Sequence, residues 1–360
     1  MNILFLGAFV PDKFADQIED LSAAGNQFQY NLYHTLKKKH EMHAMSYLAI
    51  KIELEKLGIT DSLEQEGIEL FLPKERGLRK EFIRFRKSLS KWYQWADCIL
   101  AYNVQYPWFF IGRKKRKILI LADYTPVDEE VLKKKSYSFL IQKSFWRYQK
   151  LVLLSEGAKK YVKSNQEYVV IPGAIQWENF RNFTAPKKKE KITFLYSGIL
   201  NHVTGVDILL DAFRKTENQS YELVLCGQGK ELEEQIAIAV KDDSRIHFYG
   251  YVSRERYYEL LQQADVCVNP RNMSLQQNQY NFPSKILEYI ASGRIVVSTK
   301  FRGYQNYEKY ILFCESLADS LLQEMQNAAS NSMENKIRIY DRNRKYAQSI
   351  SWGDVADLFL

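Results

Sequence analysis

The sequence predicts an α/β protein with two domains, each built on a doubly wound parallel β-sheet. The 360 residues suffice for two domains of ordinary size, and 46% of them are hydrophobic, as in most globular proteins. Short apolar segments that end in glycine or polar residues alternate with amphipathic segments of helical period. The same alternation begins again after a charged stretch at residues 185–191, which indicates a second domain.

The first half contains a series of predicted strands. It opens with a short apolar run at 2–8 that includes Gly7, and a helix is expected from about residue 22 to residue 39. Further strands are predicted in the segments 41–47, 67–73, 97–102, 117–122, 151–157 and 168–173. Ligands of open parallel sheets bind at the carboxyl ends of the strands, so Asn103 and Asp123 are expected to face a ligand.

The second half repeats this order. Strands at 192–197 and 222–229 lead into glycine turns at Gly198 and Gly227, and an amphipathic helix is predicted over 205–213. We therefore expect an acceptor-side domain at 1–185, a nucleotide-binding domain at 186–340, and a C-terminal helix at 341–360 that returns to the first domain.

One stretch of the second half combines several signals. Pro283 suits the first turn of a helix, Asn281 or Ser284 can cap it, and Gly293 suits the left-handed position that ends it. The β-branched run at 295–299 then predicts a buried parallel strand.

The helix in this stretch has two predicted faces. Ile286, Leu287, Ile290 and Ala291 share an apolar side, and the other side carries Lys285, Glu288, Tyr289 and Ser292. A helix N-terminus attracts anions, and a carboxylate one turn further in can accept two hydrogen bonds from a ribose diol. Lys285 and Glu288 can therefore recognise a nucleoside diphosphate, or they can form an ordinary surface ion pair three residues apart.

The run from Phe282 to Tyr289, followed by Ala291-Ser292-Gly293, resembles the donor-site signature of retaining glycosyltransferases with the GT-B fold, of the glycosyl transferases group 1 or family 4 type. The most similar branch is that of bacterial polysaccharide-assembly enzymes. The resemblance implies two Rossmann-like domains with a central cleft. It also implies that Glu288 binds the ribose of a nucleotide sugar, and that the turn from Asn281 to Ser284 offers N–H groups to the phosphates.

The sequence departs from the family pattern at four positions. A second glutamate is usual eight positions before Glu288, where Tyr280 stands. An arginine and a lysine that grip the diphosphate are usual where Ile199 and Thr204 stand, and a histidine is usual near Asp123. We therefore expect Lys285 and Arg271 to supply the positive charge, and Asp123 to contact the transferred sugar or the acceptor hydroxyl.

The resemblance completes the set of expected site residues. It places the nucleotide base near Tyr251 and Val252, and a glycine-bearing turn around Asn26 near the donor phosphates and the acceptor; an ordinary helix start is the alternative there. The expected catalytic residues are Asp123, Lys285 and Arg271. The expected donor-binding residues are Gly7, Asn26, Gly198, Gly227, Tyr251, Val252, Tyr280, Asn281, Phe282, Pro283, Ser284, Lys285 and Glu288.

The charge of the chain favours anionic partners. Lys and Arg number 51 against 43 Asp and Glu, a formal net charge of +8. Residues 76–95 form a basic amphipathic segment, which can lie on an anionic membrane surface or pack on the core with a solvated basic face. Nucleic acid is not expected, because no nucleic-acid-binding motif accompanies the charge.

The cysteines, the histidines and the lengths of the apolar runs indicate the compartment and the need for cofactors. The four cysteines are widely spaced beside predicted strands, which suggests buried thiols in a reducing compartment. The five histidines lack ligand spacing, so neither a metal nor another cofactor is expected beside the nucleotide-sugar substrate. No apolar run reaches the roughly 20 residues that a membrane-spanning helix needs. A cytoplasmic protein is expected, at most peripheral on the inner face of the cell membrane.

The function expected from the sequence is glycosyl transfer, of the hexosyltransferase type. A UDP-sugar is the expected donor, and a glycan or a lipid-linked saccharide of cell-surface or exopolysaccharide synthesis is the expected acceptor. The departures at Tyr280, Ile199 and Thr204 keep an alternative open, a non-catalytic nucleotide-sugar-binding or scaffold subunit of a glycosyltransferase complex. A dinucleotide-dependent oxidoreductase is disfavoured, because no G-x-G-x-x-G follows the first strand.

Overall fold

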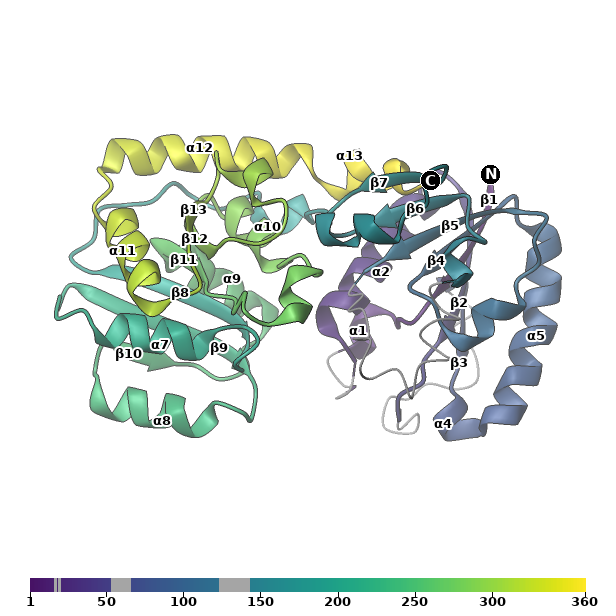
Figure 1. Ribbon diagram of the computed structural model, residues 1–360, viewed down its shortest axis with the longest axis horizontal. Helices are drawn as coiled ribbons and strands as arrows, with labels where there is room; N and C mark the ends of the chain where they lie inside the picture. Colours follow the sequence, from purple (N-terminus) through teal and green to yellow (C-terminus); the bar gives the residue numbers. More distant parts are fainter. Residues whose placement is uncertain (16–17, 19–20, 53–65, 123–142) are drawn as a thin grey trace. The chain divides into compact units, whose positions relative to one another are not determined.

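The computed structural model (Figure 1) describes residues 1–15, 18, 21–52, 66–122 and 143–360. The chain forms two compact units, one comprising Met1–Ala174 and Trp352–Leu360 and the other Ile175–Ser351. Each unit contains one parallel sheet with helices packed against it, so the predicted α/β fold is confirmed.

Unit 1 contains a seven-stranded parallel sheet in the order β3-β2-β1-β4-β5-β6-β7. Its strands are β1 (Asn2–Gly7), β2 (Glu41–Tyr47), β3 (Ile68–Phe71), β4 (Cys98–Tyr102), β5 (Arg116–Leu121), β6 (Lys150–Leu153) and β7 (Glu167–Val170). Its helices are α1 (Asp12–Ala15), α2 (Ala23–Lys37), α4 (Pro73–Arg76), α5 (Leu78–Trp95) and α13 (Trp352–Val355), with 3-10 turns η2 (Tyr106–Phe110), η4 (Glu156–Tyr161) and η8 (Ala356–Phe359). The strand order reverses between β1 and β4, where doubly wound sheets bind ligands.

Unit 2 contains a six-stranded parallel sheet in the order β10-β9-β8-β11-β12-β13. Its strands are β8 (Ile192–Ile199), β9 (Tyr221–Gln228), β10 (Ile246–Phe248), β11 (Val266–Asn269), β12 (Ile295–Thr299) and β13 (Leu312–Cys314). Its helices are α7 (Val206–Arg214), α8 (Glu233–Asp242), α9 (Arg254–Gln263), α10 (Lys285–Ala291), α11 (Ala318–Ala329) and α12 (Met333–Ser349), with 3-10 turns η5 (Trp177–Phe180), η6 (Gln276–Gln279) and η7 (Tyr304–Tyr307).

The central strands of unit 2 are buried on both faces. Phe194 and Tyr196 of β8 pack into one hydrophobic cluster, with side chains from α7, α8 and α11. Leu195, between them, packs into the opposite cluster, with side chains from α9, α10 and α12. Successive strand residues point to opposite faces, which explains why these strands appear in the sequence as continuous apolar runs.

The units divide ten residues or more away from the predicted boundaries, and the contacts explain the difference. Ile175 donates a backbone hydrogen bond to Ile350, and the Tyr340 hydroxyl and the Arg344 guanidinium donate to the carbonyls of Phe183 and Phe180, at 2.6 and 2.7 Å. Residues 175–185 therefore belong with α12 and unit 2, whereas the predicted boundary left them in the first domain.

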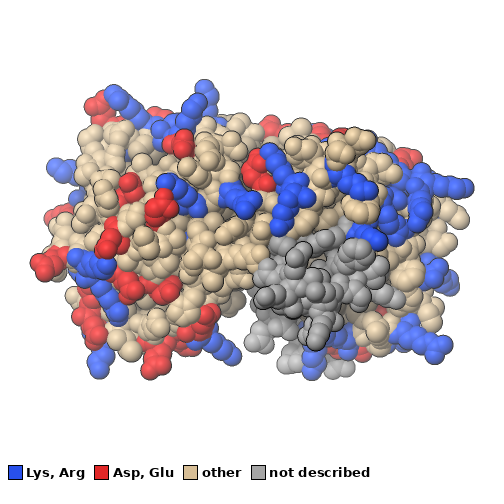
Figure 2. All heavy atoms as spheres, viewed as in Figure 1, with Lys and Arg blue, Asp and Glu red and all other residues tan. Residues whose placement is uncertain are grey.

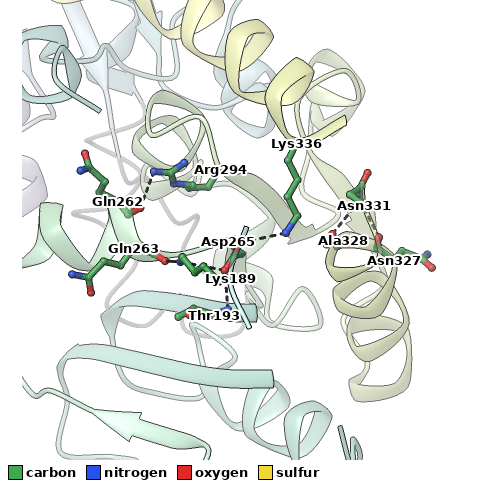
Figure 3. Close-up of polar contacts among 10 residues, drawn as sticks. All are labelled: Lys189, Thr193, Gln262, Gln263, Asp265, Arg294, Asn327, Ala328, Asn331 and Lys336. Carbon is green, nitrogen blue, oxygen red and sulfur yellow. Dashed lines mark hydrogen bonds and ion pairs between the residues drawn. The ribbon is translucent and has the colours of Figure 1, made fainter. Parts of the chain in front are cut away.

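The charged stretch that the sequence suggested as a linker is also held by unit 2. Figure 3 shows Asp265, buried at the start of β11, between Lys189 and Lys336 of α12, each with its ammonium 3.3 Å from a carboxylate oxygen. The same carboxylate accepts a hydrogen bond from the Thr193 N–H at 3.1 Å. One buried acid therefore joins the linker, the sheet and α12.

Two expectations from composition can be compared with the structure. The four cysteines, in β4, β9, β11 and β13, are all free and buried, as predicted. Within the part of the chain that the structure describes, no helix is both long and apolar enough to cross a membrane.

Candidate functional site

The carboxyl ends of β8 and β9 meet through their glycines. A side chain at Gly227 would bring its Cβ to 1.8 Å from the Gly198 carbonyl oxygen, and the Gly227 N–H donates to the Gly250 carbonyl at 2.8 Å. Both Gly227 (φ +139°) and Gly198 (φ +155°) adopt angles that other residues rarely reach. These two predicted site glycines therefore lie together, and close packing of the strand ends alone already requires Gly227.

Helix α10 begins at Lys285, with Ser284 at its N-cap position. Ser284 makes no capping hydrogen bond through its side chain, and the Asn281 Oδ1 is buried without a hydrogen-bond partner, so neither residue caps the helix as we expected. Pro283 is buried just before the cap, and its carbonyl accepts from the Ile286 N–H at 3.0 Å. At the other end, Gly293 has φ +75°, which confirms its predicted left-handed position.

The polar face of α10 is narrower than predicted. Tyr289 and Ser292 were expected beside Lys285 and Glu288, but both are buried. The Tyr289 hydroxyl accepts a hydrogen bond from the Ser197 N–H at 2.9 Å, which ties α10 to the end of β8. The residue that seemed polar from its spacing is therefore a core residue with a satisfied hydroxyl.

Lys285 and Glu288 form the i,i+3 ion pair that the sequence left open as one of two alternatives, with an Nζ to Oε2 distance of 2.9 Å. A third residue completes the group, because the Tyr257 hydroxyl of α9 donates to the same Oε2 at 2.6 Å. The Lys285 ammonium also lies 4.2 Å from the centre of the Tyr257 ring. No further hydrogen bond reaches the other carboxylate oxygen, Oε1, from the residues described, and the Glu288 side chain is 34% exposed.

The environment of Glu288 keeps it ionised. Burial by itself raises the pKa of this carboxyl, but the Lys285 charge and the Tyr257 hydroxyl outweigh burial and hold the pKa below its usual value. The carboxylate is therefore an ionised hydrogen-bond acceptor, with Oε2 held by Lys285 and Tyr257 and no hydrogen bond to Oε1 from the described residues.

Two cations act on the same strand ends. Burial raises the pKa of Tyr196 in β8 to about 12, a shift opposed by a Thr204 hydrogen bond and the Arg271 charge. Burial likewise raises the pKa of Cys226 in β9, and the Lys285 charge is among the opposing influences. Arg271 and Lys285, both predicted to supply positive charge, thus exert it at adjacent strand ends.

The departures from the family pattern have local structural roles. The Thr204 hydroxyl donates to the Ile199 carbonyl at 2.7 Å, and its N–H donates to Asn201 Oδ1 at 2.9 Å, which closes the turn after β8. The Ile199 side chain is 58% exposed at this turn. At the place of the second glutamate, the Arg302 guanidinium lies over the Tyr280 ring, 5.5 Å from its centre.

The other residues predicted for the second domain fall into two groups. Tyr251 is 62% exposed in the loop after β10, so its ring is accessible, and Val252 packs partly against the core. Phe282 packs against Phe301 and Tyr307, with ring centres 5.4 and 5.5 Å apart, and thus holds the turn before α10 in place.

The predictions for the first domain have different outcomes. Asn26 is buried, and its amide exchanges two hydrogen bonds with the backbone of Val10, at 2.8 and 3.2 Å. A Cβ at Gly7 would lie 2.6 Å from the Gln29 amide oxygen, which binds the Ala8 N–H at 2.8 Å. Both residues thus shape the turn from β1 to α2. Asp123 lies outside the described residues.

Unit 1 has a cavity of about 910 Å³, and Asn103, which the sequence predicted to face a ligand, is among the residues that line it. It lies at the carboxyl ends of β1, β2 and β4, where the strand order reverses. Asn103, which lines it, has φ +48° and is the non-glycine residue with positive φ in the described part of the chain. Its amide oxygen accepts from the Ala122 N–H at 2.9 Å, so the strained residue joins the ends of β4 and β5.

A metal centre was not expected from the sequence. Across the described ranges, no group of three or more His, Cys, Asp and Glu side chains is arranged to hold a metal ion. The Lys285–Glu288–Tyr257 group offers a single carboxylate, which is neutralised by an ammonium.

Most of unit 2 is similar to a known protein family. Residues 191–331 match the family model of glycosyl transferases group 1. The phosphatidylinositol N-acetylglucosaminyltransferase gpi3 subunit of Schizosaccharomyces pombe is 23% identical over 194 residues, which is 52% of this chain and 41% of that protein. The chain therefore spans less than half the length of this curated relative.

Solved structures match nearly the whole chain. The sucrose-phosphate synthase of Thermosynechococcus elongatus has a TM-score of 0.72 at 15% identity, covering 99% of this chain and 97% of that one. Anabaena HepE in complex with UDP has a TM-score of 0.70 at 15% identity, covering 99% and 98%. The GT-B fold predicted from the sequence is thus confirmed. The match to the group 1 family model within unit 2 supports the predicted enzyme class, a glycosyltransferase.

Proposed function

We propose that the protein is a retaining glycosyltransferase that moves a sugar from a UDP-sugar to a glycan or lipid-linked acceptor in cell-surface or exopolysaccharide synthesis. The observation that carries the proposal is the Lys285–Glu288–Tyr257 group at the strand ends of a group 1 domain. The structures of HepE with UDP and with UDP-glucose support the choice of nucleotide. The proposal that the sugar keeps its anomeric configuration rests on the family resemblance.

The chemistry assigned to these residues follows from their charges. Glu288, ionised and with Oε1 open, accepts hydrogen bonds from the ribose hydroxyls. Departure of the nucleoside diphosphate leaves negative charge on the phosphate oxygens. Lys285 and Arg271 stabilise that charge as it develops, without a metal ion. Asp123 remains the proposed contact to the transferred sugar or the acceptor hydroxyl.

A donor screen tests this proposal. UDP-, GDP- and dTDP-sugars are titrated into the purified protein without added metal, and both binding and slow nucleotide release are followed. Glu288→Ala should weaken donor binding by about 1.5 kcal/mol, as for a lost charged hydrogen bond. Glu259→Ala is the matched control, because Glu259 forms an exposed ion pair with Arg256 on α9. Equal donor affinity in wild type and Glu288→Ala would remove Glu288 from the site.

The departures at Tyr280, Ile199 and Thr204 favour a second candidate, a nucleotide-sugar-binding subunit that does not itself catalyse transfer. Thr204 closes a turn and Tyr280 stacks under Arg302, so neither offers the usual contact to the donor. Donor binding without nucleotide release, even with lipid-linked acceptors present, would select this candidate over the transferase.

We also propose that unit 1 contacts an anionic membrane surface through α5. Phe85 and Leu89 of α5 pack in the core, and Trp92 packs partly against it, so the aromatic side of the helix is occupied. The opposite side exposes Arg86, Lys87 and Lys91. Figure 2 shows Lys and Arg along the side of unit 1 where α5 runs in Figure 1. Such a contact would be mainly electrostatic, worth about 1 kcal/mol for each cation near the surface.

Vesicle co-sedimentation tests this contact. Reversal of Arg86, Lys87 and Lys91 to Glu should abolish binding to vesicles that contain phosphatidylserine. Reversal of Lys187, Lys188 and Lys191, exposed cations of unit 2, should leave binding unchanged. Persistent binding of the α5 variant would refute the membrane contact.

A further inference from the structure

The cavity of unit 1 is unlike the polar group on unit 2, because its lining is mainly apolar. Side chains from three strand ends and the first turn of α5 line it, among them Leu48, Ile50, Phe82 and Val104. A volume of about 910 Å³ is ample for a small-molecule ligand. Charged groups, apart from one arginine, are absent from the described residues that line it.

The polar side chains in this lining are mostly engaged elsewhere. The Asn26 amide is bonded to Val10, and the Gln29 amide is bonded to the backbone of Ala8 and Gly25. The Ser22 hydroxyl accepts the Gly25 N–H at 3.2 Å. Groups that already have their hydrogen bonds contribute little to binding a polyhydroxylated ligand, because a sugar buried there would leave its own hydroxyls unsatisfied.

One cation belongs to the cavity. Arg79, in the first turn of α5, lines it and is exposed, and its guanidinium makes no hydrogen bond, ion pair or ring contact with the described residues. An apolar space with a single accessible guanidinium matches an amphiphile that has one apolar chain and one phosphate.

The same turn of α5 joins the cavity to the surface. Leu78 lines the cavity and is 66% exposed, and Ile83, one turn further along, is 60% exposed. Exposed apolar side chains beside the basic face of α5 continue the apolar lining out to the proposed membrane contact.

From these observations we infer that the unit 1 cavity takes the apolar chain of a lipid-linked acceptor, with Arg79 binding its phosphate. The inference rests on the proposed function, because the lipid is an acceptor only if the protein is a transferase. It selects a lipid-linked acceptor over a free glycan.

The test uses the full chain and three soluble probes: farnesyl phosphate, farnesol and inorganic phosphate. Farnesyl phosphate should bind in equilibrium dialysis below its critical micelle concentration. Farnesol should compete with it, whereas inorganic phosphate at the same concentration should not. This pattern would show that the chain, and not the phosphate alone, is recognised.

Two variants place the probe in the cavity. Ala49 is exposed at the rim, so Ala49→Trp can fill the cavity without disturbing the core and should weaken farnesyl phosphate binding about tenfold or more. Ala237→Trp, on the exposed side of α8, is the size-matched control and should change nothing. Arg79→Ala should weaken farnesyl phosphate about fivefold and leave farnesol unaffected.

The results separate this inference from the proposed function. Unchanged farnesyl phosphate binding in Ala49→Trp, or competition by inorganic phosphate as strong as by farnesol, overturns the inference. Donor binding and turnover with no binding of farnesyl phosphate also overturn it, and leave the transferase proposal standing. Farnesyl phosphate binding that Ala49→Trp abolishes supports the lipid site even if no nucleotide sugar is bound, in which case the transferase proposal fails alone.

Discussion

The two candidate ligand sites of this protein differ in how they are built. The site on unit 2 depends on a short polar group, Lys285, Glu288 and Tyr257, beside glycines that bring two strand ends together. The cavity of unit 1 depends on apolar side chains from three strand ends and one helix. Charge and backbone geometry therefore dominate the first site, and shape and apolar volume dominate the second. Substitutions that act on one kind of feature should leave the other site intact.

The largest effect is expected from the backbone of unit 2. Gly227→Ala would place a Cβ 1.8 Å from the Gly198 carbonyl oxygen, at φ +139°, so the strand ends must separate. We expect a loss of about 3 kcal/mol or more in the free energy of unfolding, with loss of donor binding. Urea unfolding followed by circular dichroism measures it.

Gly250→Ala is the control for this substitution. Gly250 also has positive φ, at +62°, but a Cβ there would meet no atom within 4 Å. Gly250→Ala should lower the free energy of unfolding by only about 1 to 2 kcal/mol, the usual penalty for a non-glycine residue in the left-handed region. Equal losses in the two variants would mean that the strand ends are not held together by their glycines.

A smaller effect is expected where a half-buried acid joins β3 to helix α5, which lines the cavity. Glu69 of β3 accepts hydrogen bonds from Trp92 of α5 at 2.6 Å and from Ser88 of the same helix, and pairs with His43 at 3.0 Å. Burial raises the pKa of Glu69, but these bonds outweigh it and lower the pKa to about 2. Because α5 carries Phe82 into the cavity wall, this acid helps to fix the shape of the cavity.

The pH dependence follows from that shift. A carboxyl whose pKa is lower in the folded state than its ordinary 4.5 stabilises the fold above pH 4.5 and loses this contribution as the pH falls towards about 2. Glu69→Gln should therefore lower the free energy of unfolding by about 2 kcal/mol at neutral pH. Near pH 2 the variant and the wild type should have the same free energy of unfolding. Urea unfolding followed by intrinsic tryptophan fluorescence, repeated across the pH range, measures both effects. Glu41→Gln, an exposed acid of β2, should cost less than about 0.5 kcal/mol, and a loss as large as that of Glu69→Gln would contradict the assignment.

The contrast between the sites also explains what the sequence could predict. Strands β2 and β12 were predicted at the residues where the structure has them. β12 was predictable because its β-branched run is typical of a buried parallel strand. The Lys285–Glu288 pair was predictable because helix spacing alone brings the two residues together. Gly293 was predictable because its position demands a left-handed residue.

What the sequence could not predict depends on tertiary contacts. Tyr257 reaches Glu288 from another helix, 31 residues away, and no local pattern marks it. Tyr289 has the helix spacing of a polar-face residue, but β8 covers that side of α10. The cavity combines residues from Ala8 to Gln105, and Asn26, which suggested a ligand contact, is instead occupied by the backbone of Val10.

A moderate effect on the polar site should come from the residue that the sequence missed. Tyr257→Phe removes the 2.6 Å hydrogen bond to Glu288 but keeps the ring under Lys285. Donor affinity should fall by about 1 kcal/mol, the value of one hydrogen bond that orients a charged group. Calorimetric titration with the donor measures it. Tyr258, the next residue of α9, has a hydroxyl that accepts a hydrogen bond from Asn179. Tyr258→Phe is therefore the control and should leave donor affinity unchanged. An equal fall in donor affinity in both variants would mean that Tyr257 only packs.

The smallest effect is expected to be a gain. Ile199 is 58% exposed at the end of β8, where the family resemblance places an arginine, so its replacement should disturb little packing. Ile199→Arg should strengthen UDP binding by less than about 1 kcal/mol, because an exposed cation gains little from a phosphate in water. The gain should fall as salt rises, because the added attraction is screened. Ile238→Arg, at an exposed position on α8, adds the same charge away from the strand ends and should give no gain. If Ile199→Arg does not strengthen UDP binding even at low salt, the phosphates do not lie beside the end of β8. Lys285 and Arg271 would then be the cations that bind them.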